Sequence, residues 1–180
     1  NVLDRITNGD VISDNCYSGG DNPDNLALDL FTYNALNGNI ARDWSDCYYT
    51  IGVANNAIAQ IEPSTDPALT AARKNEMLGE ARFIRAFQYF DAVRLWGNIP
   101  IVLIPVDASN SETLIKTSGG LQSPPDTVYA AILNDLWFAK GVVSDVGADP
   151  SKYVVSMGAV NALIAIVYAT MTPAKWDSVA

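Results

Sequence analysis

The stretch that decides the fold runs from residue 79 to residue 102 and reads GEARFIRAFQYFDAVRLWGNIPIV. Apolar side chains recur in it at three- and four-residue spacing, which is typical of a helix. One face carries Leu78, Ala81, Arg85, Tyr89, Ala92 and Trp96, and another carries Phe83, Ala86, Phe87, Phe90 and Val93. Because both faces are rich in apolar groups, we expect neighbours on two sides of the helix. Gly97, followed by Pro100, predicts its end.

The same periodicity predicts long helices on both sides of this one. We expect them at residues 41–61, 125–142 and 156–170, and we expect the quoted helix to begin at residue 68 or 70. Two antiparallel helical hairpins, separated by a long insert, are typical of a helical-repeat solenoid with irregular insertions. The fold class predicted from the sequence is therefore all-α, with helical hairpins and long irregular loops.

The segments between the helices differ in character. Residues 99–106 read as an extended apolar segment, and residues 107–125 as a polar loop. Ser123 or Asp126 is expected to cap the helix that follows. Residues 8–39 are rich in Asn, Asp and Gly, which favour turns, and contain one short helical piece near residues 26–31. Long loops of this kind in compact domains often carry function.

Composition narrows the classes of function. The chain has 180 residues, enough for one domain, with 49% hydrophobic and 17% charged residues. Its net charge of −9 argues against nucleic acid and against anionic membrane surfaces as partners. The chain has no histidine, so the most common general base and metal ligand is missing. Cys16 and Cys47 form no CxxC pair, which argues against zinc; they are expected either as free buried thiols or as one disulfide.

The region around the last predicted helix admits two interpretations. Residues 153–174 carry no charge, and an apolar span of this length is close to that of a membrane-crossing helix. Polar and small residues interrupt it, however, at Ser156, Gly158, Asn161, Thr170 and Thr172. A buried helix within a stack is therefore the favoured interpretation.

No enzyme motif is present in the sequence. It contains no GxSxG turn, no P-loop and no HExxH pair, and the Asp-rich loop lacks the Gly and distal Glu of an EF-hand. Two carboxylates that hydrolyse a glycoside are recognised by their separation in space, and the sequence singles out no such pair. We expect a protein without catalysis, metal or cofactor.

The charged residues of the quoted helix also admit two interpretations. They are Glu80, Arg82, Arg85, Asp91 and Arg94. In a catalytic interpretation, burial among aromatic rings would perturb their ionisation. In a structural one, they pair with each other and with loop carbonyls, and Asp91 and Arg94 have the i,i+3 spacing of partners. The structural interpretation is favoured, because the planar fork of arginine suits several fixed hydrogen bonds.

The helical aromatic residues are assigned to the core for a similar reason. Trp44 and Tyr48 lie at helical spacing beside aliphatic residues, as do the rings of the quoted helix. Aromatic rings also stack on sugars, which is the alternative interpretation. Asn55 is expected to cap a backbone group within the stack. Gly97 and Pro100 are structural because they end the quoted helix.

Five stretches, taken together and in order, resemble one family. They are ISDNCYSGGDNPDN (12–25), WSDCYYTIGVANNAIAQIE (44–62), GEARFIRAFQYFDAVRLWGNIPIV (79–102), PPDTVYAAILNDLWFAKGVV (124–143) and VVSMGAVNALIAIVYATM (154–171). Each resembles a segment of the SusD/RagB family of surface lipoproteins, and the resemblance is collinear over nearly the whole chain. The family's fold is mainly α, with tetratricopeptide-like helix pairs and long loops.

The resemblance implies a function and a location. Members of the family capture glycans at the outer membrane and pass them to a SusC-like TonB-dependent transporter. They are much longer than 180 residues, so residues 1–180 are expected to be an N-terminal part, with the lipid anchor and the C-terminal half lying outside this sequence. Two alternatives stay open: a tetratricopeptide-type scaffold for protein interactions, and a SusD-like protein for a nutrient other than a glycan.

The resemblance also implies where a glycan would bind. Loops of this N-terminal region contribute to the glycan face of the family, and sugar recognition needs aromatic platforms with short amides and carboxylates for the hydroxyl groups. The residues of this kind in the loop are Asp14, Asn15, Tyr17, Asp21, Asn22 and Tyr33. The alternative is a solvated loop held by Asn and Asp turns.

Overall fold

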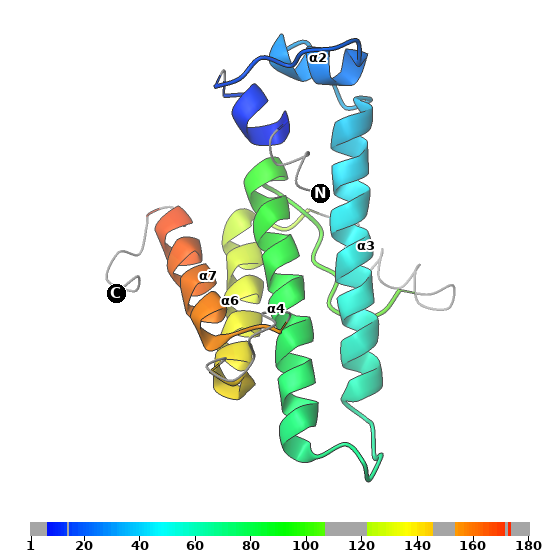
Figure 1. Ribbon diagram of the computed structural model, residues 1–180, viewed down its shortest axis with the longest axis vertical. Coiled ribbons are helices and arrows are strands. Elements are labelled where there is room, and N and C mark those ends of the chain that lie inside the picture. Colours follow the sequence, from blue (N-terminus) through cyan, green and yellow to red (C-terminus); the bar gives the residue numbers. More distant parts are fainter. Residues whose placement is uncertain (1–6, 14, 107–121, 146–153, 172, 174–180) are drawn as a thin grey trace. The chain divides into compact units, whose positions relative to one another are not determined.

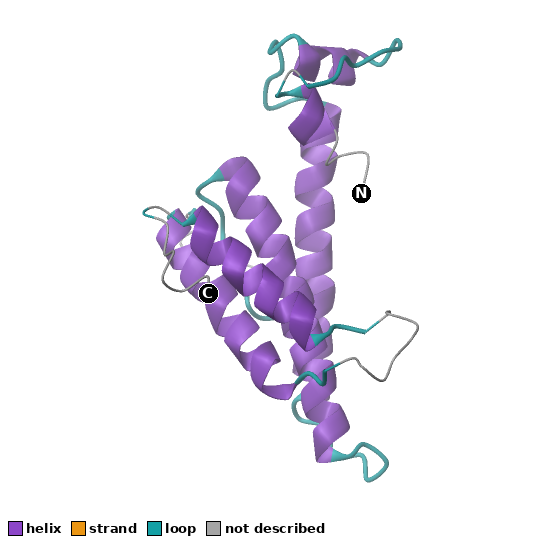
Figure 2. Cartoon of the chain, turned by 60° about the vertical axis from the view of Figure 1, so that its left-hand side comes forward, coloured by secondary structure: helices purple, strands orange, loops and turns teal. Residues whose placement is uncertain are grey.

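The computed structural model describes residues 7–13, 15–106, 122–145, 154–171 and 173, and these residues are mainly helical (Figures 1 and 2). The elements are the π-helical turn η1 (Thr7–Val11) and the helices α2 (Pro23–Asp29), α3 (Gly38–Ile61), α4 (Ala71–Trp96), α6 (Pro125–Val142) and α7 (Met157–Thr170). The all-α prediction is confirmed. The four long helices lie within three residues of the predicted bounds, and the short one begins three residues earlier than predicted.

The chain divides into two units, residues 1–48 and residues 49–180, which we describe one at a time. In the second unit, α4 packs against α6, and α6 packs against α7 (Figure 1). The core of this unit is aliphatic and aromatic. One stripe of α6 is completely buried, and its members, at three- and four-residue spacing, are Val128, Ile132, Leu136 and Ala139.

The quoted stretch forms most of α4, as predicted. Thr70 caps the start by accepting a hydrogen bond from the Arg73 amide at 3.2 Å. The helix ends before Gly97, whose φ of 70° is rarely adopted by residues with a side chain. Beyond Gly97, Ile99 and Ser123 exchange two backbone hydrogen bonds of 3.2 and 2.8 Å.

The start of α6 differs from the prediction. Neither Ser123 nor Asp126 caps this helix, since Pro124 occupies the N-cap position and no side chain bonds to the first amides. Pro125 stands at the first helical position instead, where the amide it lacks would have had no partner within the helix. Asp126 remains in the first turn, where the helix dipole favours a negative charge.

Helices α4 and α6 approach closely at Gly79. A β-carbon at this position would lie 2.6 Å from Cγ2 of Val142 and 3.0 Å from Cγ1 of Val143. A larger side chain at residue 79 would therefore require the side chains of Val142 and Val143, or the helices themselves, to shift. A second contact region joins α3 and α4, where Ile58, Leu78 and Ala81 form a buried cluster.

The structure also bears on the two cysteines and on the apolar last helix. Neither cysteine forms a disulfide; Cys47 is buried, whereas Cys16 is exposed, so the expectation of two buried thiols was wrong for Cys16. In the described ranges, no helix has the length and apolar character needed to span a bilayer. With 14 residues, α7 is shorter than such a span requires.

Candidate functional site

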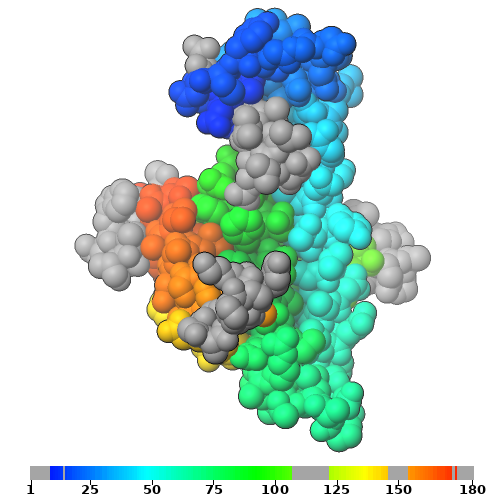
Figure 3. Space-filling model, viewed as in Figure 1, coloured from blue at the N-terminus to red at the C-terminus, as the bar shows by residue number. Residues whose placement is uncertain are grey.

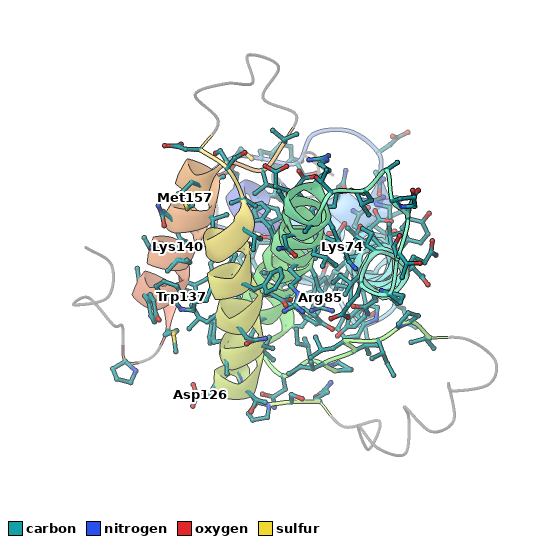
Figure 4. All side chains as sticks on the ribbon, turned by 90° about the horizontal axis from the view of Figure 1, so that it is seen from below. Lys74, Arg85, Asp126, Trp137, Lys140 and Met157 are labelled. Atoms are coloured by element: carbon teal, nitrogen blue, oxygen red, sulfur yellow. The ribbon has the colours of Figure 1, made fainter. Side chains whose placement is uncertain are left out.

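The most buried polar contact of the second unit joins α4 to α6. Arg85 and Asp135 are 5% and 1% exposed. Nε of Arg85 donates to Oδ2 of Asp135 at 2.7 Å, and Nη2 donates to Oδ1 at 2.7 Å. Figure 4 shows Arg85 among the helices. Because both carboxylate oxygens accept from one guanidinium, the pair forms a fixed fork between two helices.

The remaining donors of Arg85 reach the segment that follows α4. Nη1 donates to Oδ1 of Asn55 at 2.8 Å and to the Leu103 carbonyl at 3.1 Å. Nδ2 of Asn55 donates to the carbonyls of Val102 (2.9 Å) and Ile104 (3.2 Å). Asn55 therefore caps backbone groups of the extended segment, and α3, α4 and this segment share one hydrogen-bonded network.

Tyr89 completes the network from the next turn of α4. Its hydroxyl donates to the Val102 carbonyl at 2.8 Å and accepts from the Val102 amide at 2.7 Å. Burial raises the pKa of Tyr89 to about 12, although the hydrogen bond to Val102 and the charge of Arg85 act in the opposite direction. The network is buried and its polar groups are bonded to one another, which supports a structural interpretation rather than proton transfer at this place.

The other charged residues of α4 lie closer to the surface. The guanidinium of Arg82 lies over the ring of Phe138 at 4.0 Å and also 4.0 Å from Asp135. Glu80 pairs with Arg73 at 3.4 Å, a partner outside the predicted set. Asp91 and Arg94 form the predicted i,i+3 ion pair. Arg94 also covers the ring of Phe90. The two carboxylates of this set, Glu80 and Asp91, are each paired with an arginine.

The aromatic residues assigned to the core differ in burial. Tyr89 and Phe90 are buried, whereas Phe83, Phe87 and Trp96 are half-buried. The rings of Phe83 and Phe87 stack with centroids 6.4 Å apart. In the first unit, the half-buried rings of Trp44 and Tyr48 lie 4.7 Å apart.

The candidate ligand residues belong to the first unit. Asp14 lies outside the described residues. Tyr17 is 75% exposed and Tyr33 is 40% exposed, so both rings are available to a ligand. Asn15 and Asp21 are also exposed. The side chain of Asn22 caps α2 instead, since its Oδ1 accepts from the amides of residues 24 and 25 at 2.9 and 3.3 Å.

Two buried asparagines that sequence reasoning missed hold this loop. Nδ2 of Asn37 donates to the Asp24 carbonyl at 2.9 Å, and its Oδ1 accepts from the amides of Asn39 and Ile40 at the start of α3. Nδ2 of Asn39 donates to Oδ1 of Asn25 at 2.5 Å. The Asn-Gly-Asn sequence indicated only a turn, although an asparagine before a helix is a signal for an N-cap.

Sequence reasoning also missed a strained turn at the end of α2. Phe31 has φ of 53° and is the one described non-glycine residue with positive φ. Its amide donates to the Leu28 carbonyl, and the Thr32 amide donates to the Ala27 carbonyl at 2.9 Å. This is the Schellman pattern, with phenylalanine where glycine is usual. The left-handed conformation costs about 1–2 kcal/mol for a residue with a side chain.

Comparison with known proteins places this arrangement in a family. A family model described as "Starch-binding associating with outer membrane" matches residues 6–169. SusD-like protein P2 of Formosa agariphila is 34% identical over 141 residues, which cover 78% of this chain and 26% of that protein. A SusD-like protein of Bacteroides ovatus is 29% identical, over 77% of this chain and 24% of that protein. This chain spans about a quarter of the length of these relatives.

Solved structures give the same result. A protein described as a laminarin-binding SusD-like protein superposes with a TM-score of 0.71 and 27% identity, covering 84% of this chain and 31% of that one. The arrangement of helical hairpins and connecting loops is thus shared with SusD-like proteins in sequence and in structure. The chain belongs to the SusD-like family.

Proposed function

We propose that the protein binds oligo- or polysaccharides at the cell surface and delivers them to a TonB-dependent outer-membrane transporter, without chemistry of its own. The observation that carries the proposal is the family match over residues 6–169. The similarity to a laminarin-binding protein supports a glycan as the ligand. Residues 1–180 would then be the N-terminal part of a longer, lipid-anchored protein, of which relatives are about three times this length.

The structure suggests how the work is divided. The network of Arg85, Asp135 and Asn55 has no free reactive group and holds the helices and the segment after α4 together. Tyr17 and Tyr33, in contrast, present exposed rings on irregular backbone. A ring face attracts the C–H groups of a pyranose, and nearby amides and carboxylates form hydrogen bonds with its hydroxyl groups. We assign recognition to the loop and rigidity to the helices.

Binding is tested on the full-length protein by a glycan array and by affinity electrophoresis, with laminarin and starch among the polysaccharides. Retardation by at least one polysaccharide is the expected result. If no plant, host or microbial polysaccharide retards the protein, the glycan proposal fails. Binding to a peptide library in place of sugars would then favour the scaffold or a peptide nutrient.

The absence of catalysis is tested on the same preparation. The purified protein is incubated with each polysaccharide that it binds, and reducing ends are measured over time. We expect no release above that of a heat-denatured control. Sustained release that scales with protein concentration would contradict the non-catalytic assignment and favour a glycoside hydrolase.

A further inference from the structure

The negative charge of the protein is concentrated in its first unit. Residues 1–48 carry eight Asp and two Arg, whereas the whole chain has a net charge of −9. Within residues 6–41, whose described part is drawn mostly in blue in Figure 3, the charged residues are all Asp, at positions 10, 14, 21, 24 and 29. This stretch contains both exposed tyrosines that we assign to the glycan. The loop therefore offers a ligand side-chain charges of one sign.

Acidic residues lie on both sides of each of the two rings. The Asp10 carbonyl accepts from the amides of the two residues before Tyr17, at 3.0 and 3.3 Å, so Asp10 lies beside the chain that leads to this ring. Asp21 is exposed and follows Tyr17 by four residues. Asp29 stands in the last turn of α2, four residues before Tyr33, and that turn has no basic residue. A ligand on either ring therefore approaches Asp side chains and no Lys or Arg of this loop.

Aspartate is compatible with an uncharged sugar and incompatible with an anionic one. Ionised Asp only accepts hydrogen bonds, and the hydroxyl groups of a neutral sugar can donate them. Carboxylate and sulfate groups also only accept, so they repel Asp, and proteins bind them through Arg and Lys. A divalent cation could join two such anions, but in the part of the chain that the structure describes, no three acidic or thiol side chains gather as a metal site requires. The loop thus has acceptors for hydroxyl groups and no basic side chain for an anionic group.

We propose that this loop selects uncharged glycans and discriminates against glycans that carry carboxylate or sulfate groups. The inference rests on the proposed function, because it names the class of substrate that the same loop takes. Tyr17 and Tyr33 supply the stacking faces, which attract any pyranose, and the Asp residues around them supply the selection by charge.

The test uses the full-length protein and pairs of polysaccharides that share a backbone and differ in charge. Each polysaccharide that the glycan array identifies is paired with its sulfated derivative if it is uncharged, as for laminarin, or with its methyl ester if it is acidic, as for polygalacturonate. Isothermal titration calorimetry gives the dissociation constant of each member. We expect the uncharged member of each pair to bind at least about tenfold more tightly at about 0.02 M salt. This ratio should shrink at about 0.5 M salt, because screening removes repulsion but not the steric effect of the added group.

Charge reversal tests whether the loop is responsible for the selection. Asp10→Lys with Asp29→Lys changes two carboxylates that are not among the predicted ligand residues, and a lysine at residue 29 suits the C-terminal end of α2. We expect the ratio between the uncharged and the charged member to fall at least about threefold, while the affinity for the uncharged glycan stays within about twofold of the wild type. The matched control is Glu62→Lys with Asp145→Lys, which makes the same change of charge at exposed residues that follow the C-terminal ends of α3 and α6. The control should leave the ratio close to that of the wild type.

The outcomes separate this inference from the proposed function. Equal or tighter binding of the anionic member of a pair would overturn the inference, and the protein would still be a glycan-binding protein. A ratio that does not change with salt, or equal effects of the loop variant and the control variant, would also overturn it, because the selection would then not come from the charges of the loop. If the wild type binds no glycan, the proposed function fails and the inference fails with it.

Discussion

Arg85 of α4 and Asp135 of α6 are fifty residues apart in sequence and are joined in the core by two hydrogen bonds of 2.7 Å. Each is almost fully buried, so neither charge is compensated by water. The same guanidinium also holds Asn55 of α3 and the Leu103 carbonyl. One side chain therefore links three parts of the second unit.

Removal of Arg85 should be costly because Asp135 stays buried without its partner. For Arg85→Met we expect the free energy of unfolding to fall by about 3–5 kcal/mol. The double variant Arg85→Met, Asp135→Leu should recover much of this loss, since an apolar pair replaces the ionic one. Urea denaturation followed by circular dichroism measures both. A single variant within about 1 kcal/mol of the wild type would contradict the structural role.

Asn55 offers a comparison with its neighbour on the same helix. Asn55→Leu removes the donor to the Val102 and Ile104 carbonyls, and we expect a loss of about 1–3 kcal/mol. Asn56 is exposed, and its side chain bonds only to the Gly52 carbonyl of its own helix, at 2.9 Å. Asn56→Leu should change stability by less than about 0.5 kcal/mol. Equal effects in thermal unfolding would show that the network does not fix the extended segment.

Tyr89 predicts a dependence of stability on alkaline pH. Its pKa is raised from 10.0 to about 12 by burial, so above pH 10 the unfolded chain loses the proton while the folded chain keeps it. The contribution of Tyr89 to the free energy of unfolding is complete below pH 10 and is lost as the pH rises through 12. Between pH 9 and pH 11 the wild type should lose about 1 kcal/mol more than Tyr89→Phe. Parallel losses in the two proteins would argue against a buried phenol.

Gly79 tests the close approach of α4 and α6. Alanine is the better helix former, but its β-carbon would meet Val142 at 2.6 Å. We expect Gly79→Ala to destabilise by about 1–3 kcal/mol, and Val142→Ala to relieve part of this cost in the double variant. Gly52→Ala on α3 is the control: apart from the backbone of its own helix, no atom of the described residues lies within 4 Å of its added carbon, so it should stabilise by about 0.5–1 kcal/mol. Stabilisation by both alanines would place α4 and α6 further apart.

The helices were predictable because their signals are local. The 3.6-residue spacing of apolar groups predicted the long helices, and Gly97 predicted the end of α4; the structure places these elements within three residues of expectation. The buried faces followed from the same spacing. The cap of α6 was predicted incorrectly, because Pro124, whose side chain has no acceptor, occupies the N-cap position in place of Ser123 or Asp126.

The partners of the charged residues could not be predicted in the same way. Arg85 was assigned a structural role, but Asp135 lies fifty residues away and nothing local marks it as the partner. The left-handed backbone of Phe31 was also hidden, since sequence rules reserve that position for glycine. In the loop, the side chain of Asn22 caps α2, and those of Asn37 and Asn39 form hydrogen bonds within the loop and to the start of α3. Only the fold distinguishes such residues from ligand contacts.

The division between a rigid helical scaffold and a recognising loop is tested most directly by one comparison. The dissociation constant for the polysaccharide that the full-length protein binds is measured by isothermal titration calorimetry for the wild type and for Tyr17→Ala with Tyr33→Ala. We predict that affinity falls at least about tenfold while the melting temperature is unchanged, because both rings are exposed and stacking is lost. Unchanged affinity in the double variant would contradict the assignment of recognition to this loop.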